Sequence, residues 1–161
     1  MPPSPQAQTL NQKSLFAFKS IFAALPAPQV VNLSGVYRAE FTGPGWLRRV
    51  APPGLGLLGL GGWKGKEFSG DGRGLNLVRR RGELLRIFPV RLLLADSSID
   101  GKACLAVHYA PECPFPWPYV FDELRQLDET CLLGLTITHL GLLRKLALPF
   151  LLHAQEKPHG L

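Results

Sequence analysis

The chain has 161 residues, about the length of one domain, so we expect a single hydrophobic core and no second domain. Its 17 glycines and 15 prolines interrupt an apolar fraction of 46%, a pattern that favours short strands over long helices. The net charge is +6, but the basic residues are scattered and lack the interleaved aromatic side chains of single-strand binders, which argues against nucleic-acid binding.

The cysteines indicate the compartment. Cys104, Cys113 and Cys131 are odd in number and form no Cys-x-x-Cys pair, so we expect free thiols and a cytoplasmic protein. An apolar stretch at 14–25 resembles the core of a secretory signal, but Lys19 interrupts it and the first twelve residues carry no positive charge. No apolar run reaches the roughly 20 residues that cross a bilayer.

The N-terminal region is expected to contain a tail and a helix. Residues 1–12 are rich in Pro, Ser, Gln and Asn, which predicts a disordered tail. From Ser14, a plausible helix cap, apolar residues recur at helical spacing over 14–25, and Lys19 lies on the opposite side. These apolar residues are Leu15, Phe18, Phe22 and Leu25. The spacing predicts a short amphipathic helix that ends before Pro26.

From about residue 36 the apolar period changes to two. Tyr37, Ala39 and Phe41 share one face of a predicted strand. Residues 43–62 are expected to form a loop or a helical turn. Short alternating segments, separated by turns, then predict further strands at about 64–69, 74–80, 83–93, 102–109, 119–127, 131–138 and 149–155.

Sequential strands joined by short turns are typical of an antiparallel meander, and closure of the meander removes its exposed edges. We therefore predict a mainly β fold, a single antiparallel up-and-down β-barrel of about eight strands with a short N-terminal amphipathic helix. The domain would span residues 13–156, with a frayed C-terminus at 157–161. The helix is expected to plug one end of the barrel; a membrane-surface helix, a partner helix and an uncleaved targeting segment are the alternatives.

Two patterns have the residue types of a cofactor or metal site. The spacing Gly-x-Gly-x-x-Gly at 54–59 matches a dinucleotide loop, but prolines precede it, where the fingerprint needs a strand, and more glycines follow it. Cys104, His108 and Cys113 offer three zinc ligands, but their spacing is not typical and no fourth ligand lies close. We therefore expect no cofactor and no metal.

The candidate catalytic groups are few. Ser97, Ser98, His108 and Asp122 are available, but no Gly-x-Ser-x-Gly elbow presents a serine nucleophile. Asp122 and Glu123 are adjacent, so on a strand they face opposite sides and cannot share a proton.

Glu123 and Arg125 share one strand face with aromatic residues. If that face points into the barrel, Arg125 would anchor a carboxylate or phosphate group. If it points outward, the two residues form an exposed ion pair that contributes little energy.

A glycine-rich turn carries a family resemblance. The segment Gly61-Gly62-Trp63-Lys64-Gly65, followed by Lys66 and Phe68 and, downstream, by Asp122-x-x-Arg125 and Leu133-Gly134, resembles the GXWXG family of small bacterial and fungal proteins of unassigned function, whose barrels are similar to lipocalins. The resemblance covers Trp63 to about His153. A second stretch, 33–37, is similar to the opening strand of lipocalins, with Tyr37 in the place of the usual tryptophan. The family likeness implies an apolar-ligand barrel and carries over Gly61, Trp63, Gly65, Lys66, Asp122 and Arg125.

The leading hypothesis is a calycin-like protein that binds a small, largely apolar ligand, with an acidic group on the ligand as an option. The candidate ligand-binding residues are Tyr37, Phe41 and Trp63 as apolar walls, Lys66 and Arg125 for an anionic end, and Asp122 beside them. One alternative is an isomerase, cyclase or hydrolase on the same scaffold that uses His108 or Asp122 for proton transfer. A weaker alternative is contact with anionic membranes through the N-terminal helix and Arg79-Arg80-Arg81.

Overall fold

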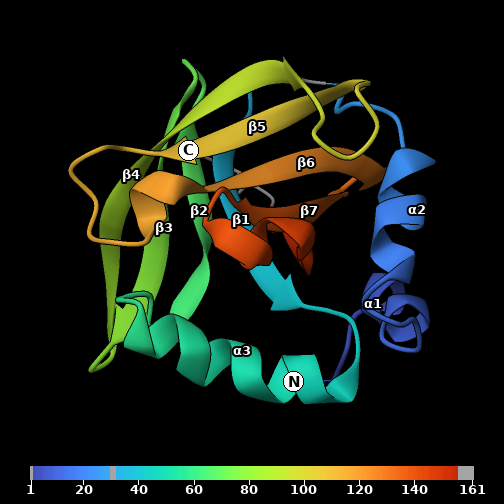
Figure 1. The fold of residues 1–161 in the computed structure, drawn as a ribbon. Coiled ribbons are helices and arrows are strands. Elements are labelled where there is room, and N and C mark those ends of the chain that lie inside the picture. The colour runs from blue at the N-terminus through green and yellow to red at the C-terminus, as the bar shows by residue number, and fades with distance from the viewer. Residues whose placement is uncertain (1, 30–31, 156–161) are drawn as a thin grey trace, which may run out of the picture.

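The structure, a computed structural model, describes residues 2–29 and 32–155 and forms a closed β-barrel with helices on one side and across one end (Figure 1). Each strand pairs antiparallel with the next along the chain, and the last pairs with the first. The strands are β1 Ser34–Phe41, β2 Trp63–Ser69, β3 Arg73–Arg80, β4 Glu83–Asp96, β5 Ala103–Tyr109, β6 Val120–Asp128, β7 Cys131–Thr138 and β8 Leu148–Ala154. The predicted fold class, an eight-stranded antiparallel up-and-down barrel, is confirmed. The C-terminal segment 157–161 lies outside the described residues.

Alternation and turn chemistry explain the meander. In β1, Tyr37 and Ala39 pack against the interior core, as their shared face predicts. The turn between β3 and β4 has positive φ at both central residues, Arg81 at 51° and Gly82 at 79°, which is what a tight type I′ hairpin requires. A β-bulge lies in β4 next to Pro89, where the register of β4 against β3 shifts between Gly74 and Asn76, and proline has no backbone N–H to donate to the neighbouring strand.

A second bulge lies at the start of β2, where the register against β3 shifts between Trp63 and Gly65. Strict alternation would place Trp63 and Lys66 on opposite faces of the sheet, because Lys66 is the third residue after Trp63. The extra residue of the bulge brings both side chains into the barrel. Gly65 has a φ of 148°, and a Cβ there would collide with the carbonyl oxygen of Tyr37, so only glycine fits.

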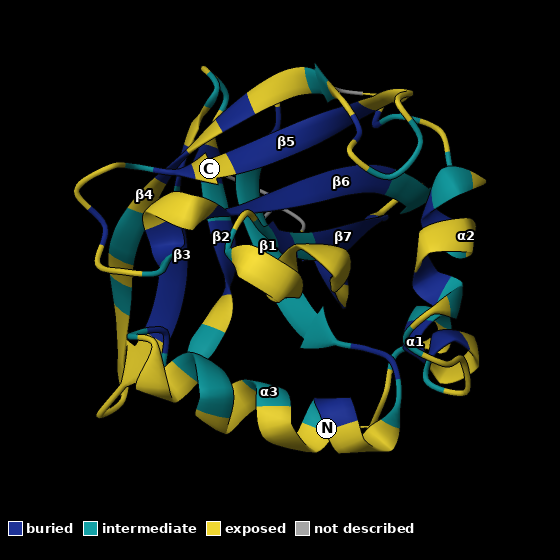
Figure 2. Cartoon of the chain, viewed as in Figure 1, coloured by how far each residue is buried: buried dark blue, intermediate teal, exposed yellow. Residues whose placement is uncertain are grey.

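Two short helices, α1 Pro5–Leu10 and α2 Ala17–Ala23, lie against the outer wall of the barrel (Figure 1). The apolar residues of these helices form a second core with the outward side chains of β5 to β8. Its buried members are Ala7, Leu10, Phe18, Phe22, Cys104, Phe121, Cys131, Leu133, Leu135, Ile137, Ala147 and Leu151. Figure 2 shows the consequence, since β5, β6 and β7 are buried along much of their length.

Residues 1–12 were expected to form a disordered tail, but residues 5–10 are the helix α1. Ser4 caps this helix by accepting a hydrogen bond from the Ala7 backbone N–H at 3.1 Å, and Pro5 follows at the first helical position. The Ser4 hydroxyl also donates to Glu40 of β1 at 2.6 Å. Burial of Ala7 and Leu10 against the barrel then stabilises a segment whose composition alone favours disorder.

The barrel end is covered by helix α3, Gly45–Leu57, and not by the predicted N-terminal helix (Figure 1). Pro52 and Pro53 lie inside α3, and because proline removes a helical hydrogen bond, the sequence predicts only a loop or a helical turn for this segment. Leu47 is buried and Leu55 packs against the interior core, so tertiary contacts stabilise the helix. Two short 3-10 turns, η1 Trp117–Tyr119 and η2 Gly141–Lys145, complete the described elements, and none of the described helices is long and apolar enough to cross a membrane.

Candidate ligand-binding site

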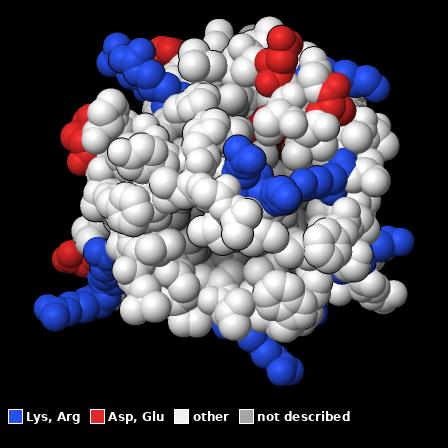
Figure 3. Space-filling model, in the orientation of Figure 1, with Lys and Arg blue, Asp and Glu red and all other residues white. Residues whose placement is uncertain are grey.

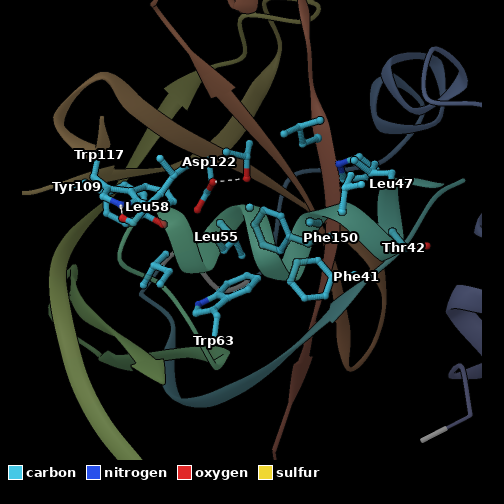
Figure 4. Close-up of a pocket in the computed structure, with 17 residues that line it drawn as sticks. Phe41, Thr42, Leu47, Leu55, Leu58, Trp63, Tyr109, Trp117, Asp122 and Phe150 are labelled. Carbon is cyan, nitrogen blue, oxygen red and sulfur yellow. Dashed lines mark hydrogen bonds between the residues drawn. The ribbon is translucent and has the colours of Figure 1, made fainter. Parts of the chain in front are cut away.

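A cavity of about 270 Å³ lies between α3 and the interior of the barrel. Its walls are largely apolar and aromatic, and Figure 4 shows the side chains gathered around it. The lining residues are Phe41, Thr42, Leu47, Val50, Ala51, Gly54, Leu55, Leu58, Leu60, Trp63, Tyr109, Trp117, Asp122, Thr136, Leu148, Pro149 and Phe150. Since a dry cavity of about 150 Å³ accommodates benzene, this one has room for a molecule of roughly twice that size.

A buried lysine stands behind the polar part of the wall. Lys66 of β2 is completely buried, and its Nζ donates to Asn76 Oδ1 at 2.8 Å and to the Tyr109 hydroxyl at 3.1 Å. The same Nζ lies 3.3 Å from Oδ2 of Asp122, which is also buried. An ammonium group has three hydrogens, and these three contacts engage all of them.

The electrostatics of this cluster follow from burial. Burial lowers the pKa of Lys66, because the ammonium loses its hydration, and the neighbouring charge of Asp122 opposes this shift. Burial also raises the pKa of the Tyr109 hydroxyl well above its ordinary value. The Lys66 ammonium lies 4.9 Å from the ring centre of Tyr109 and 5.6 Å from that of Trp63, where the aromatic faces favour a cation.

Hydrogen bonds orient the residues around the pair. Asn76 Oδ1 accepts from both Lys66 and the Trp63 indole N–H, the latter at 3.1 Å, while its amide nitrogen donates to the backbone of Phe88 at 2.9 Å. The Thr136 hydroxyl donates to Asp122 Oδ1 at 2.8 Å. The cluster therefore joins β2, β3, β5, β6 and β7 and holds each polar side chain in one orientation.

Three of these residues were not among the predicted site residues: Asn76, Tyr109 and Thr136. The sequence feature that marks these residues is a polar side chain within the alternating pattern of a strand, with apolar residues nearby. Asn76 shares its strand face with Gly74 and Val78, and a lone amide on a buried face needs partners inside the protein. That feature marks a buried polar position but does not identify its partners, which come from other strands.

The six predicted ligand-binding residues occupy four different places. Phe41, Trp63 and Asp122 line the cavity. Lys66 lies directly behind the lining, in contact with Asp122. Tyr37 packs inside the barrel against Phe68, with ring centres 5.6 Å apart, and is not part of the lining.

The sixth residue, Arg125, lies on the outer face of β6. Its guanidinium donates to both carboxylate oxygens of Asp100 at 2.7 Å and to the Phe22 carbonyl of α2 at 3.0 Å, and it stacks on the Phe22 ring at 4.5 Å. This corrects the inward orientation considered above, in which Arg125, like Lys66, would hold an anionic group of the ligand. Alternation along β6 explains the placement, because Asp122 and Leu124 point inward. Arg125 attaches α2 to the barrel wall.

Glu123, on the same outer face, accepts hydrogen bonds from the Ser97 hydroxyl at 2.7 Å and from the Ser98 backbone N–H at 2.6 Å. It is buried, so the exposed Glu123–Arg125 ion pair, the other option from the sequence, is not formed either. The two residues have different partners around the same loop. Their polar contacts arrange the β4–β5 connection beneath α2.

His108, one of the two proton carriers considered, also lies outside. It is exposed on β5 and stacks on Phe121 with ring centres 5.6 Å apart, so it does not reach the cavity. Asp122 does line it. Among residues 2–29 and 32–155, no group of three or more His, Cys, Asp or Glu side chains is arranged to hold a metal ion.

The two segments expected to contact a membrane, the N-terminal helix and Arg79-Arg80-Arg81, lie in different surroundings. The apolar residues Phe18 and Phe22 of α2 are buried against the barrel, while Arg79-Arg80-Arg81 lies at the exposed β3–β4 hairpin. Figure 3 shows the basic side chains of this face in separate groups. The two predicted elements therefore do not form one continuous basic and apolar patch.

Comparison with known proteins supports the architecture. No family model matches the chain, and no curated protein matches it. The crystal structure of a protein from Thermomonospora curvata is similar, with a TM-score of 0.69 over 92% of this chain and 93% of that chain, at 17% sequence identity. At this identity the likeness concerns the fold alone. The neighbour and the closed eight-stranded meander fit a lipocalin-like barrel fold.

Proposed function

We propose that this protein binds one small, largely apolar molecule in the cavity between α3 and the barrel. The observation that carries the proposal is the lining itself, a mostly apolar and aromatic wall with one compact polar cluster. Binding sites for small molecules have this composition, in which apolar walls supply affinity and a few convergent polar groups supply orientation.

The glycine-rich turn acquires a role in this proposal. Trp63 and Lys66 both belong to β2, and the bulge at Gly65 turns both side chains into the barrel. Trp63 can therefore form part of the cavity wall while Lys66 compensates the charge of Asp122 on β6. These are residues that the GXWXG resemblance carries over, and we propose that the chain is a distant member of that family. The three buried free cysteines support our expectation of a cytoplasmic location.

Indole NMR signals offer a direct test, because the three tryptophans differ in position. Trp63 and Trp117 line the cavity, whereas Trp46 is outside the lining and 58% exposed. Titration with methylnaphthalene, whose size suits the cavity, is expected to shift the Trp63 and Trp117 indole signals saturably and to leave Trp46 unchanged.

A cavity-filling substitution supplies the control. Ala51→Phe places a ring in the cavity and is expected to abolish the shifts, whereas Leu57→Phe, at a position on the same helix that is 90% exposed, is expected to retain them. The proposal fails if the wild type shows no saturable shift, or if Ala51→Phe binds as well as the wild type.

One observation favours an enzyme as the second candidate, namely the carboxylate of Asp122 in the lining. A buried carboxylate beside a bound substrate can act as a general base, a role that contributes about a hundredfold or more to rate. Hydrolysis of naphthyl acetate, which has the same ring system, tests this candidate. We expect the wild-type rate to exceed that of Asp122→Asn by about a hundredfold if Asp122 is the base. If the wild type and Asp122→Asn hydrolyse the ester at equal rates, and the variant still binds methylnaphthalene, Asp122 is not a catalytic base and only the binding function is supported.

A further inference from the structure

We infer that the ligand of this cavity is an uncharged molecule with a hydroxyl group, and that the hydroxyl lies between Asp122 and Tyr109. The inference rests on the proposed function and specifies the chemical class of the ligand. It follows from the charges of the lining, from the hydrogen-bond donors in it, and from the acceptors that face the cavity.

The charge of the lining disfavours an anionic ligand. The lining contains Asp122 but no lysine, arginine or histidine among the residues that the structure describes. Lys66, the nearest cation, is engaged by Asn76, Tyr109 and Asp122, and its charge balances that of Asp122. A carboxylate in the cavity would lose its hydration next to a like charge and gain no free cation in return.

The charge balance between Lys66 and Asp122 also disfavours a cationic ligand. Lys66 and Asp122 together carry no net charge, so an ammonium group in the cavity would leave two buried cations beside one carboxylate. Burial of an uncompensated charge is costly at either sign. A neutral molecule leaves the existing pair undisturbed.

Most hydrogen-bond donors of the wall are already engaged inside the protein. The indole of Trp63 donates to Asn76, and the indole of Trp117 donates to the Leu58 carbonyl at 2.6 Å. The Thr136 hydroxyl donates to Asp122. A ligand that only accepts hydrogen bonds therefore finds little to pair with along this wall.

Asp122 and Tyr109 retain hydrogen-bonding capacity. The two oxygens of a carboxylate accept about four hydrogen bonds, and the contacts with Thr136 and Lys66 use two of these positions. Figure 4 shows the Asp122 carboxylate among the side chains that line the cavity. The Tyr109 hydroxyl accepts from Lys66 and lies beside Asn76, and its own hydrogen can rotate toward the cavity. A ligand hydroxyl can donate to Asp122 and accept from Tyr109, so it satisfies both groups.

A matched series of naphthalene derivatives tests this assignment by calorimetric titration of the wild type. The members, substituted at one ring position, are methylnaphthalene, naphthylmethanol, its methyl ether, naphthoate and naphthylmethylammonium. We expect the alcohol to bind about tenfold or more tightly than its ether, because the ether lacks the hydrogen donated to a charged acceptor. Naphthoate is expected to bind most weakly of the five.

The double variant Lys66→Met/Asp122→Leu assigns the preference to the pair. It removes both charges together, so no uncompensated charge is left in the barrel. The advantage of the alcohol over the ether is expected to fall within about twofold. Should this variant fail to fold, the wild-type series decides the question by itself.

The outcomes separate the two proposals. Equal affinities of alcohol and ether, or tightest binding by naphthoate or by the ammonium compound, would overturn the assignment of an uncharged hydroxyl ligand and leave the binding function intact. If none of the five compounds binds, methylnaphthalene included, the proposed function itself is contradicted and this inference falls with it.

Discussion

Lys66 and Asp122 approach each other to 3.3 Å, Nζ to Oδ2, inside the barrel, one from β2 and the other from β6. Both are buried, and no buried side-chain nitrogen or oxygen in the described part of the chain lacks a hydrogen-bond partner. The pair thus places two ionic groups in an apolar interior without leaving either uncompensated. Because the two charges balance, the pair presents no net charge to a ligand in the cavity.

Breaking this pair on one side is expected to destabilise the fold. Lys66→Met leaves the carboxylate of Asp122 buried without its cation, a change that costs about 3–5 kcal/mol in comparable sites. The double variant Lys66→Met/Asp122→Leu is expected to recover most of that loss. Urea unfolding of the two variants and the wild type checks this, and a double variant less stable than Lys66→Met would contradict it.

Gly65→Ala is expected to destabilise the protein by about 3 kcal/mol or more, because strained backbone and a collision with the Tyr37 carbonyl act together. Gly54→Ala is the matched control. Gly54 lies in helix α3 with open space where a Cβ would stand, so alanine is expected to stabilise by about 0.5–1 kcal/mol. Thermal unfolding measures both, and a Gly65→Ala protein as stable as the wild type would refute the role of the bulge.

The Asp100–Arg125 pair predicts acid sensitivity. The Arg125 guanidinium holds the pKa of the Asp100 carboxyl well below its usual range. A lowered folded-state pKa contributes stability that is fully present above the unfolded pKa, about 4, and is lost as the pH falls below it. Asp100→Asn is therefore expected to lose less stability than the wild type between about pH 7 and pH 3.

Glu83→Gln, which removes a carboxylate from the exposed β3–β4 hairpin, serves as the control and is expected to follow the wild-type pH profile. Chemical denaturation at each pH measures the free energy of unfolding. Parallel profiles for Asp100→Asn and the wild type would show that the pair does not stabilise the attachment of α2.

Two of the three cysteines, Cys104 and Cys131, are expected to be unreactive in the native protein. Cys104 and Cys131 are fully buried, and burial raises the pKa of each thiol to about 12, so thiolate is scarce near neutral pH. Cys113 is buried as well. Iodoacetamide at about pH 8 should label all three in denaturant and leave Cys104 and Cys131 unmodified in the native state, as mass spectrometry can establish. Rapid native labelling of either would contradict this packing.

Local patterns were sufficient to predict the strands and their order. Period-two alternation marks residues on one strand face, and glycine at the turns marks the hairpins, so β2 to β5 lie close to the predicted segments. The same alternation correctly placed Asp122 and Glu123 on opposite faces of β6. Three of the six predicted ligand-binding residues, Phe41, Trp63 and Asp122, line the cavity, although Trp63 and Lys66 both face the interior only because of the bulge in β2.

The position of Arg125 shows what local sequence patterns do not determine. Alternation states which residues share a face, but it does not state which face points inward when both are buried. On β6 both faces are buried, because α2 covers the outer one. An apolar outer face then has the same sequence pattern as an interior face. The face that carries Phe121 and Arg125 could therefore be assigned either to the barrel interior or to the outer wall.

The chain by itself determined an eight-stranded antiparallel meander, because strand alternation and turn geometry depend on neighbouring residues. Tertiary structure alone decided three further features: α3 over the barrel end, α1 and α2 on the outer wall, and Lys66 beside Asp122 through the bulge at Gly65. Each depends on contacts between residues that are distant in sequence, such as β2 with β6, and no local propensity encodes those contacts.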